Sequence, residues 1–99
     1  MKPLTEKQKR HLRALAHHKQ PVVRTGNAGL TANVLMEIDN ALTAHELVKV
    51  KLVAEDRAAR SAMIETICAR TKSVCVQQIG HIASFYRRHP DQPKIVLPV

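Results

Sequence analysis

Aromatic side chains are scarce in this 99-residue chain, which has one phenylalanine, one tyrosine and no tryptophan. RRM and OB-fold proteins stack several bases on aromatic rings, so this chain does not have the residues for that mode of nucleic-acid binding. No apolar run approaches the roughly 20 residues that a membrane-spanning helix needs, and the N-terminus contains no apolar signal segment. We therefore expect a cytoplasmic protein with no membrane segment.

Motifs that carry catalysis or bind metals are also absent from the sequence. The two cysteines, Cys68 and Cys75, form no C-x-x-C pair, and no cysteine–histidine pair has zinc-ligand spacing. No serine lies in a G-x-S-x-G motif, and there is no G-x-x-x-x-G-K-S/T phosphate loop. We expect buried thiols, no metal, no cofactor and no enzymatic activity.

Acidic residues are half as frequent as basic ones, with 8 Asp and Glu against 16 Lys and Arg, a net charge of +8. The excess is concentrated near the start: residues 1–29 carry seven cations and only Glu6, residues 30–73 are neutral, and residues 74–99 carry a net +2. A surplus of this size in a small domain favours a polyanionic partner. The alternative is a surface charge that only keeps the protein soluble.

The length fits one domain, residues 1–99, with a partly extended tail from about residue 89. Capping motifs and apolar periodicity predict the following order: helix 5–18, strand 21–24, a helix from residue 31, strand 47–53, a helix after residue 56, strands 73–78 and 81–87, and an extended segment 94–97 as an additional edge. This α-β-α-β-α-β-β alternation indicates a compact α/β layered domain. Along strand 47–53, Val48 and Val50 alternate with Lys49 and Lys51, so at least part of one sheet face should be uncovered.

A glycine-bounded loop, Gly26-Asn27-Ala28-Gly29, lies between a strand and a helix that Thr31 caps. Glycines allow positive φ and a close approach of backbone to ligand, and the following helix start offers unpaired N–H groups. KH domains use a G-x-x-G loop to clamp a nucleic-acid backbone. The loop therefore predicts a phosphate cradle beside Arg24, with an ordinary strand–helix turn as the alternative.

Cations elsewhere could supply the charge that the uncharged loop lacks. We predict RNA contacts from the basic arc of the first helix, from the exposed sheet face and from the end of the last strand: Lys7, Lys9, Arg10, Arg13, Lys49, Lys51 and Arg87. Each could instead be an ordinary solvated charge. Tyr86, next to Arg87, could stack one base, but packing in the core is the more common role of such a residue.

Several segments together resemble the CRM domain (chloroplast RNA splicing and ribosome maturation) of the stand-alone bacterial YhbY type. They are Pro21-Val22-Val23, Gly26-x-x-Gly29-Leu30-Thr31, Val34-Leu35-x-Glu37-Ile38, Ala41-Leu42, His45-Glu46-Leu47-Val48-Lys49-Val50-Lys51, Gln78-Ile79-Gly80 and Tyr86-Arg87. The resemblance implies a mixed sheet packed with helices, like the C-terminal domain of a bacterial translation initiation factor. It also implies RNA binding linked to maturation of the large ribosomal subunit, with the G-x-x-G loop in contact with RNA. Gln20 departs from the pattern, in which a basic residue precedes the proline.

The sequence thus predicts a monomeric, non-enzymatic RNA-binding protein that contacts ribosomal RNA in large-subunit precursors (pre-50S) through the G-x-x-G loop and an adjoining basic helix. One alternative is a ribosome-associated protein-interaction module that uses the open sheet face. A weaker alternative is DNA binding by the first helix, for which no helix-turn-helix or dimer seam is present.

Overall fold

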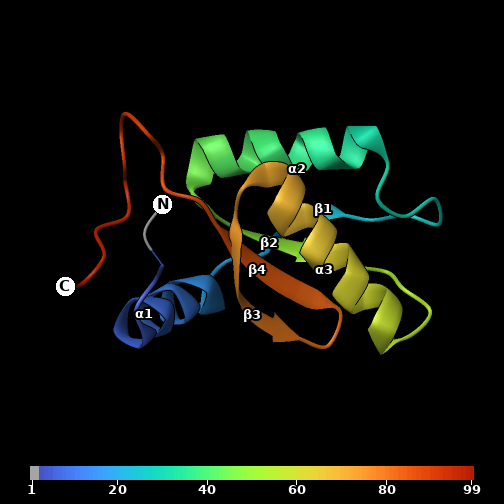
Figure 1. Ribbon diagram of the computed structural model, residues 1–99, viewed down its shortest axis with the longest axis horizontal. Coiled ribbons are helices and arrows are strands. Elements are labelled where there is room, and N and C mark those ends of the chain that lie inside the picture. The colour runs from blue at the N-terminus through green and yellow to red at the C-terminus, as the bar shows by residue number, and fades with distance from the viewer. Residues whose placement is uncertain (1–2) are drawn as a thin grey trace.

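The computed structural model describes residues 3–99, in which helices and strands alternate as the sequence predicts. The elements are α1 (Glu6–His17), β1 (Pro21–Arg24), α2 (Ala32–His45), β2 (Leu47–Lys51), α3 (Arg57–Thr71), β3 (Val74–Ile79) and β4 (Ile82–Tyr86) (Figure 1). The predicted α/β class and element order are confirmed. Segment 94–97 does not add an edge strand, because the backbone N–H groups of Lys94 and Ile95 donate to the Glu46 carboxylate instead.

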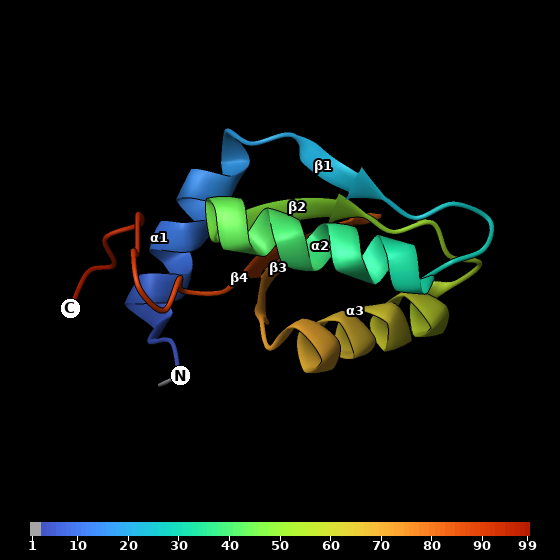
Figure 2. The same ribbon diagram turned by 90° about the horizontal axis from the view of Figure 1, so that it is seen from above.

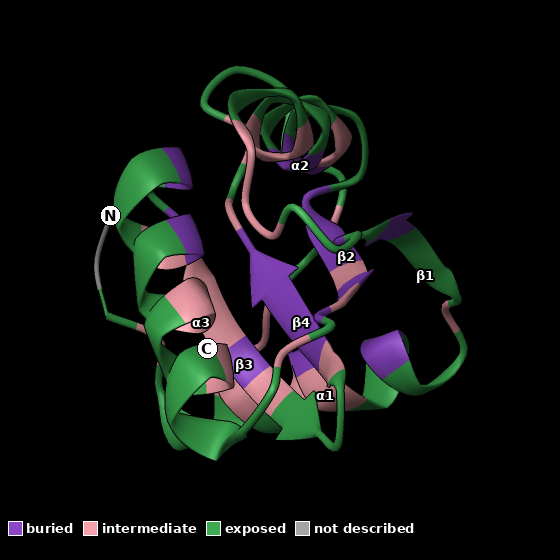
Figure 3. Cartoon of the chain, turned by 90° about the vertical axis from the view of Figure 1, so that its right-hand side faces the viewer, coloured by how far each residue is buried: buried purple, intermediate pink, exposed green. Residues whose placement is uncertain are grey.

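The four strands form one mixed sheet in the order β1-β2-β4-β3. β1 pairs with β2 in parallel, whereas the β2–β4 and β3–β4 pairs are antiparallel. Helices α2 and α3 cover one face of this sheet, and α1 packs on the other face (Figures 1 and 3). The protein is therefore a three-layer structure in which one of the two outer layers is a single helix.

Each sheet face carries its own apolar core. On the α2/α3 face, residues such as Val48, Val50 and Phe85 are buried with Ile38 and Leu42 of α2. On the α1 face, a smaller cluster joins two helix residues to three strand residues: Leu12, Ala16, Leu47, Val76 and Tyr86. Because α1 covers only the first part of β2, at Leu47, the later residues on that face, Lys49 and Lys51, stay half-exposed.

Side-chain caps begin the three helices at the expected places. At α1, Thr5 Oγ1 accepts from the backbone N–H of Gln8, and the Gln8 side chain accepts from the backbone N–H of Thr5, which completes a capping box. Thr31 caps α2 by accepting from the backbone N–H of Val34, and Asp56 caps α3 by accepting from that of Ala59, each without the reciprocal bond of a capping box. Within residues 3–99, no helix has both the length and the apolar character needed to cross a bilayer.

Candidate nucleic-acid interface

The loop Gly26–Gly29, hereafter the GxxG loop, is a tight and open turn. The N–H of Gly29 donates to the carbonyl oxygen of Gly26 at 3.0 Å, and Gly29 has φ +74°, which favours glycine. A Cβ built on Gly26 would have no atom within 4 Å, so the backbone of the loop faces open space. Asn27 and Ala28 are exposed at its tip. The geometry leaves room for a ligand to approach the main chain.

The start of the loop is anchored in the protein interior by Thr25. This residue is fully buried, and its Oγ1 accepts from the backbone N–H of Val53 at 2.8 Å. Its own N–H donates to the carbonyl oxygen of Lys51 at 3.0 Å. On the other side of the loop, Thr31 Oγ1 accepts from the N–H of Val34 at 3.2 Å and starts α2. The GxxG loop is therefore held between the end of β2 and the first turn of α2.

Three of the predicted cations lie together on the sheet face opposite α2 and α3. Arg24 of β1 is in register with Lys51 of β2. Lys49 lies two residues before Lys51, on the same face of β2. Arg24 is exposed, and both lysines are half-exposed. None of the four strands contains an Asp or Glu residue. The strands thus contribute cations and no carboxylate to the surface that begins where the GxxG loop leaves the sheet.

The basic helix does not adjoin the GxxG loop, and this part of the sequence prediction was wrong. In both ribbon views α1 lies at one end of the molecule and the GxxG loop at the other, along the longest dimension of 39 Å (Figures 1 and 2). The reason is that β1 carries the chain away from the end of α1, along the edge of the sheet, before the loop begins. The two features could contact one polyanion only if it crossed the sheet face.

Three of the four α1 cations are partly engaged by the protein itself. Arg13 Nε donates to the carbonyl oxygen of Val76 at 3.0 Å and so attaches α1 to β3. Glu6 forms ion pairs of 3.7 Å with both Lys9 and Arg13. Lys7 and Arg10 are exposed, and the Lys7 ammonium donates to the carbonyl oxygen of Val99 at 3.5 Å. RNA contact by these four residues remains a prediction.

Arg87 differs from the other predicted contacts because four hydrogen bonds within the protein engage its guanidinium. Its guanidinium donates to Asp39 Oδ1 at 2.6 Å, to the Asp39 carbonyl oxygen at 3.0 Å, to Thr43 Oγ1 at 2.9 Å and to the Thr71 carbonyl oxygen at 2.8 Å. These bonds join α2 to the end of α3. Because its donors are used inside the protein, we remove Arg87 from the candidate interface.

Tyr86 packs in the core instead of stacking bases. It is 1% exposed, and its hydroxyl has no hydrogen-bond partner among residues 3–99. Burial raises the pKa of this phenol, the nearby Glu46 carboxylate raises it further, and Arg88 opposes both.

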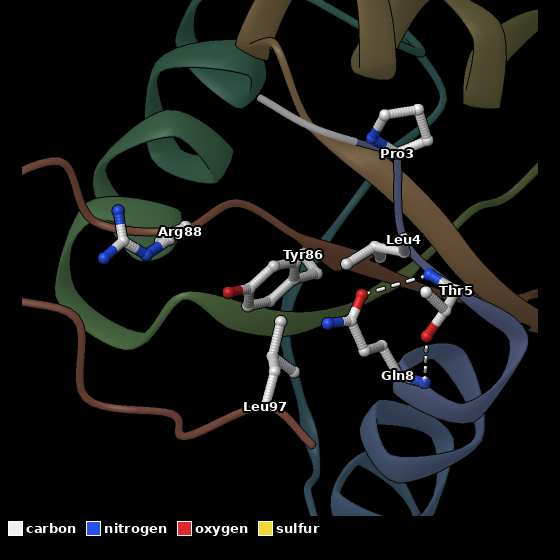
Figure 4. A pocket seen from close by; sticks show the side chains of 7 residues that line it. All are labelled: Pro3, Leu4, Thr5, Gln8, Tyr86, Arg88 and Leu97. Carbon is white, nitrogen blue, oxygen red and sulfur yellow. Dashed lines mark hydrogen bonds between the residues drawn. The ribbon is translucent and has the colours of Figure 1, made fainter. Parts of the chain in front are cut away.

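The Tyr86 ring lines a pocket of about 540 Å³ between the start of α1 and the C-terminal tail (Figure 4). Arg88 is the only charged side chain in this lining, so the pocket holds no set of catalytic groups.

Glu46 has a role that the sequence did not reveal. It is 1% exposed, sits at φ +63° at the end of α2, and its carboxylate accepts three backbone N–H groups of the tail. The donors are His89 at 2.9 Å, Lys94 at 2.6 Å and Ile95 at 2.8 Å. Burial by itself would raise the pKa of this carboxyl, but the three hydrogen bonds outweigh it and hold the pKa below its ordinary value. No local signal identifies this site, because the donors lie 43 to 49 residues away.

Residues 3–99 contain no group of three His, Cys, Asp or Glu side chains that could hold a metal ion. Cys68 and Cys75 are free and half-buried against the α2/α3 core. Burial raises the pKa of both thiols, and the neighbouring Cys68 raises that of Cys75 further.

Residues 4–87 match the family model of the CRS1/YhbY (CRM) domain. The chain belongs to this family. Among its CRM relatives is an RNA-binding protein of Haemophilus influenzae, 49% identical over 98 residues, which span 99% of this chain and 98% of that protein. The probable RNA-binding protein YqeI of Bacillus subtilis is 35% identical over 96% of this chain and 99% of its own length.

A solved structure shares the fold of this CRM domain. The solution structure of a hypothetical protein from Staphylococcus aureus superposes with a TM-score of 0.83 at 36% identity, covering 97% of this chain and all of that chain. The family resemblance and the mixed α/β fold expected from the sequence are therefore both confirmed.

Proposed function

We propose that this CRM-domain protein binds RNA without acting as an enzyme, and that its RNA is ribosomal RNA in large-subunit precursors. One observation carries the RNA-binding part: the anchored, open GxxG loop leads directly into a sheet face with three cations and no carboxylate. The names of the two relatives above agree with it. The ribosomal part rests on the resemblance to the CRM family. The cytoplasmic location and the monomeric state remain predictions.

In this proposal the RNA is held mainly through its backbone. One phosphate accepts N–H groups from the GxxG loop and the first turn of α2, where the helix dipole favours an anion. Arg24, two residues before the loop, and Lys51, its register partner on β2, add charge on the sheet face opposite α2. Both aromatic side chains are buried, so bases are not stacked on rings. Such binding has little sequence preference, because phosphates are the same in every sequence.

The salt dependence of binding tests the phosphate grip. If Arg24, Lys49 and Lys51 each neutralise one phosphate of a single strand, log K should fall against log salt with a slope of about −2. A slope near zero would contradict the ionic contact. Fluorescence anisotropy with a labelled single-stranded RNA measures it.

A substitution of Gly26 by aspartate tests the loop itself. Gly26 has no positive φ and open space around its Cβ, so Gly26→Asp should fold normally. The new carboxylate lies where a phosphate would approach, and we expect at least tenfold weaker RNA binding. Ser61→Asp, on the exposed side of α3, is the control with the same change of net charge. Equal affinity of the two variants would remove the GxxG loop from the interface.

Ribosome association needs a separate experiment in cells. Ultraviolet crosslinking followed by sequencing of the bound RNA should recover large-subunit ribosomal RNA, and the protein should co-sediment with large-subunit precursors. Digestion of the RNA should release it. Co-sedimentation that survives complete RNase treatment would instead favour a protein-interaction module.

A further inference from the structure

Three neighbouring pockets lie between the open sheet face and the C-terminal ends of α1 and α2. The first, of about 150 Å³, lies on the open sheet face and includes Lys49 and Ile79. The second, of about 220 Å³, also includes Lys49, together with Lys19 and His45. The third, of about 500 Å³, again includes Lys19 and His45 and extends to His18 and Lys94. Lys49 lines both the first and the second pocket, and Lys19 and His45 line both the second and the third, so the three pockets are neighbours, and we call them together the basic groove.

Charges of one sign line the basic groove. Its cationic side chains are Lys19, Lys49 and Lys94, with His18 and His45 between them, and no Asp or Glu lines any of the three pockets. Within residues 3–99, none of these three lysines forms an ion pair, whereas Lys9 and Arg13 on α1 both pair with Glu6. Three unpaired lysines without a carboxylate favour a polyanion over an ordinary protein surface as the occupant.

The outer wall of the basic groove is held in place from inside the protein. The buried Glu46 carboxylate accepts from the backbone N–H groups of Lys94 and Ile95, which places the tail beside the end of α2. The Lys94 ammonium then donates to the carbonyl oxygen of Ala44 at 3.1 Å. A buried carboxylate is stable only when hydrogen bonds satisfy it, and here those bonds also fix one side of the groove.

The floor of the basic groove exposes aliphatic surface. Val22 in the second pocket is 55% exposed, and Ile79 in the first is 66% exposed. Unpaired bases can cover such carbons, whereas a duplex would present its charged backbone to them. The polymer that fits both the lysines and the aliphatic floor is a single-stranded nucleic acid.

We propose that the basic groove binds single-stranded RNA that continues from the GxxG loop, with phosphates near Lys19, Lys49 and Lys94 and unpaired bases over Val22 and Ile79. This inference rests on the proposed function and extends it. A GxxG loop clamps about four nucleotides in KH domains, and domains that bind single strands cover about 4–16. A tetranucleotide therefore reaches only one of the two sites, and a longer strand reaches both.

The test compares two oligonucleotide lengths on two charge-matched variants. The groove variant is Lys19→Ala/Lys94→Ala, and the control is Arg57→Ala/Arg70→Ala on α3, behind the opposite sheet face. For RNA of about 12 nucleotides, the groove variant should bind about tenfold more weakly, with a salt slope smaller by about 1.4. For RNA of about 4 nucleotides seated at the loop, it should differ from the control by less than twofold.

A third variant tests the base contacts. Val22→Ser removes exposed apolar surface but no charge, so it should weaken binding of the longer RNA about threefold and leave the salt slope unchanged. Circular dichroism of each variant must match the wild type. A change of salt slope with Val22→Ser would contradict the assigned role of the floor.

The outcomes separate this inference from the proposed function. If the wild type binds neither RNA, both are wrong. If Gly26→Asp weakens binding while the groove variant equals its control on the longer RNA, the proposed function holds and the groove inference is overturned. If an RNA duplex of the same length binds as tightly and loses as much in the groove variant, the groove does not select single strands.

Discussion

Replacing the buried carboxylate of Glu46 by an amide should free the C-terminal tail. In Glu46→Gln, one side-chain oxygen remains, and an NH₂ group takes the place of the other. The amide oxygen can still accept from Lys94 and Ile95, but the NH₂ group then faces the N–H of His89, a donor against a donor. Hydrogen bonds to a charged acceptor contribute about 1.5–3 kcal/mol each, and an unsatisfied buried donor costs about 1–3 kcal/mol. One lost hydrogen bond to a charged acceptor and one unsatisfied buried donor together predict a loss of about 2.5–6 kcal/mol in the free energy of unfolding.

Urea denaturation followed by circular dichroism measures the global effect, and amide hydrogen exchange measures the tail. The amides of His89, Lys94 and Ile95 should exchange much faster in the variant, while those in the core of the sheet keep their order of protection. Glu65→Gln, at an exposed position of α3, is the control and should change stability by less than about 0.5 kcal/mol.

The pH dependence of the wild type provides a second readout of the same contact. The pKa of Glu46 is lower in the folded protein than in the unfolded chain, where a glutamate titrates near about 4.3. The ionised form therefore stabilises the fold. This contribution is complete above the unfolded pKa and is lost as pH falls through the folded pKa. The stability difference between wild type and Glu46→Gln should shrink below pH 4 or so.

Two results would refute this reasoning. One is unchanged exchange of the three tail amides in Glu46→Gln. The other is a stability difference between the two proteins that stays constant through the acidic range, since that would mean the Glu46 charge does not hold the tail.

Further predictions follow from single contacts. Arg87→Lys should lower the free energy of unfolding by about 2–3 kcal/mol in urea titrations, because an ammonium cannot replace the guanidinium fork that joins α2 to α3. Thr25→Val keeps the shape but leaves the backbone N–H of Val53, just after β2, without its acceptor, and should cost about 1–3 kcal/mol. Gly29→Ala should cost about 1–2 kcal/mol through its positive φ alone, with no steric clash. Cys68 and Cys75, whose pKa values burial raises, should react with iodoacetamide more slowly at pH 7 than a free cysteine does, as mass spectrometry can follow.

Much of the candidate site was predictable, because its signals are local. The residues that begin α1, from Thr5 to Gln8, predicted a capping box that the structure contains. The GxxG loop was predicted between a strand and a helix from its two glycines and the Thr31 cap. The alternation at Lys49 and Lys51 predicted a partly uncovered sheet face. In each case the interacting groups lie within a few residues of one another, so their spacing in sequence determines their geometry.

Tertiary structure decided which of these features lie together. The basic helix and the GxxG loop are separated by the length of the sheet, although few residues separate them along the chain. Arg87 is occupied by partners up to 48 residues away, and Glu46 by donors up to 49 residues away. The basic groove joins residues of α1, α2, β2 and the tail region that share no sequence pattern. Sequence periodicity records which side of its own element a residue occupies, but contacts between distant elements depend on how the whole chain packs.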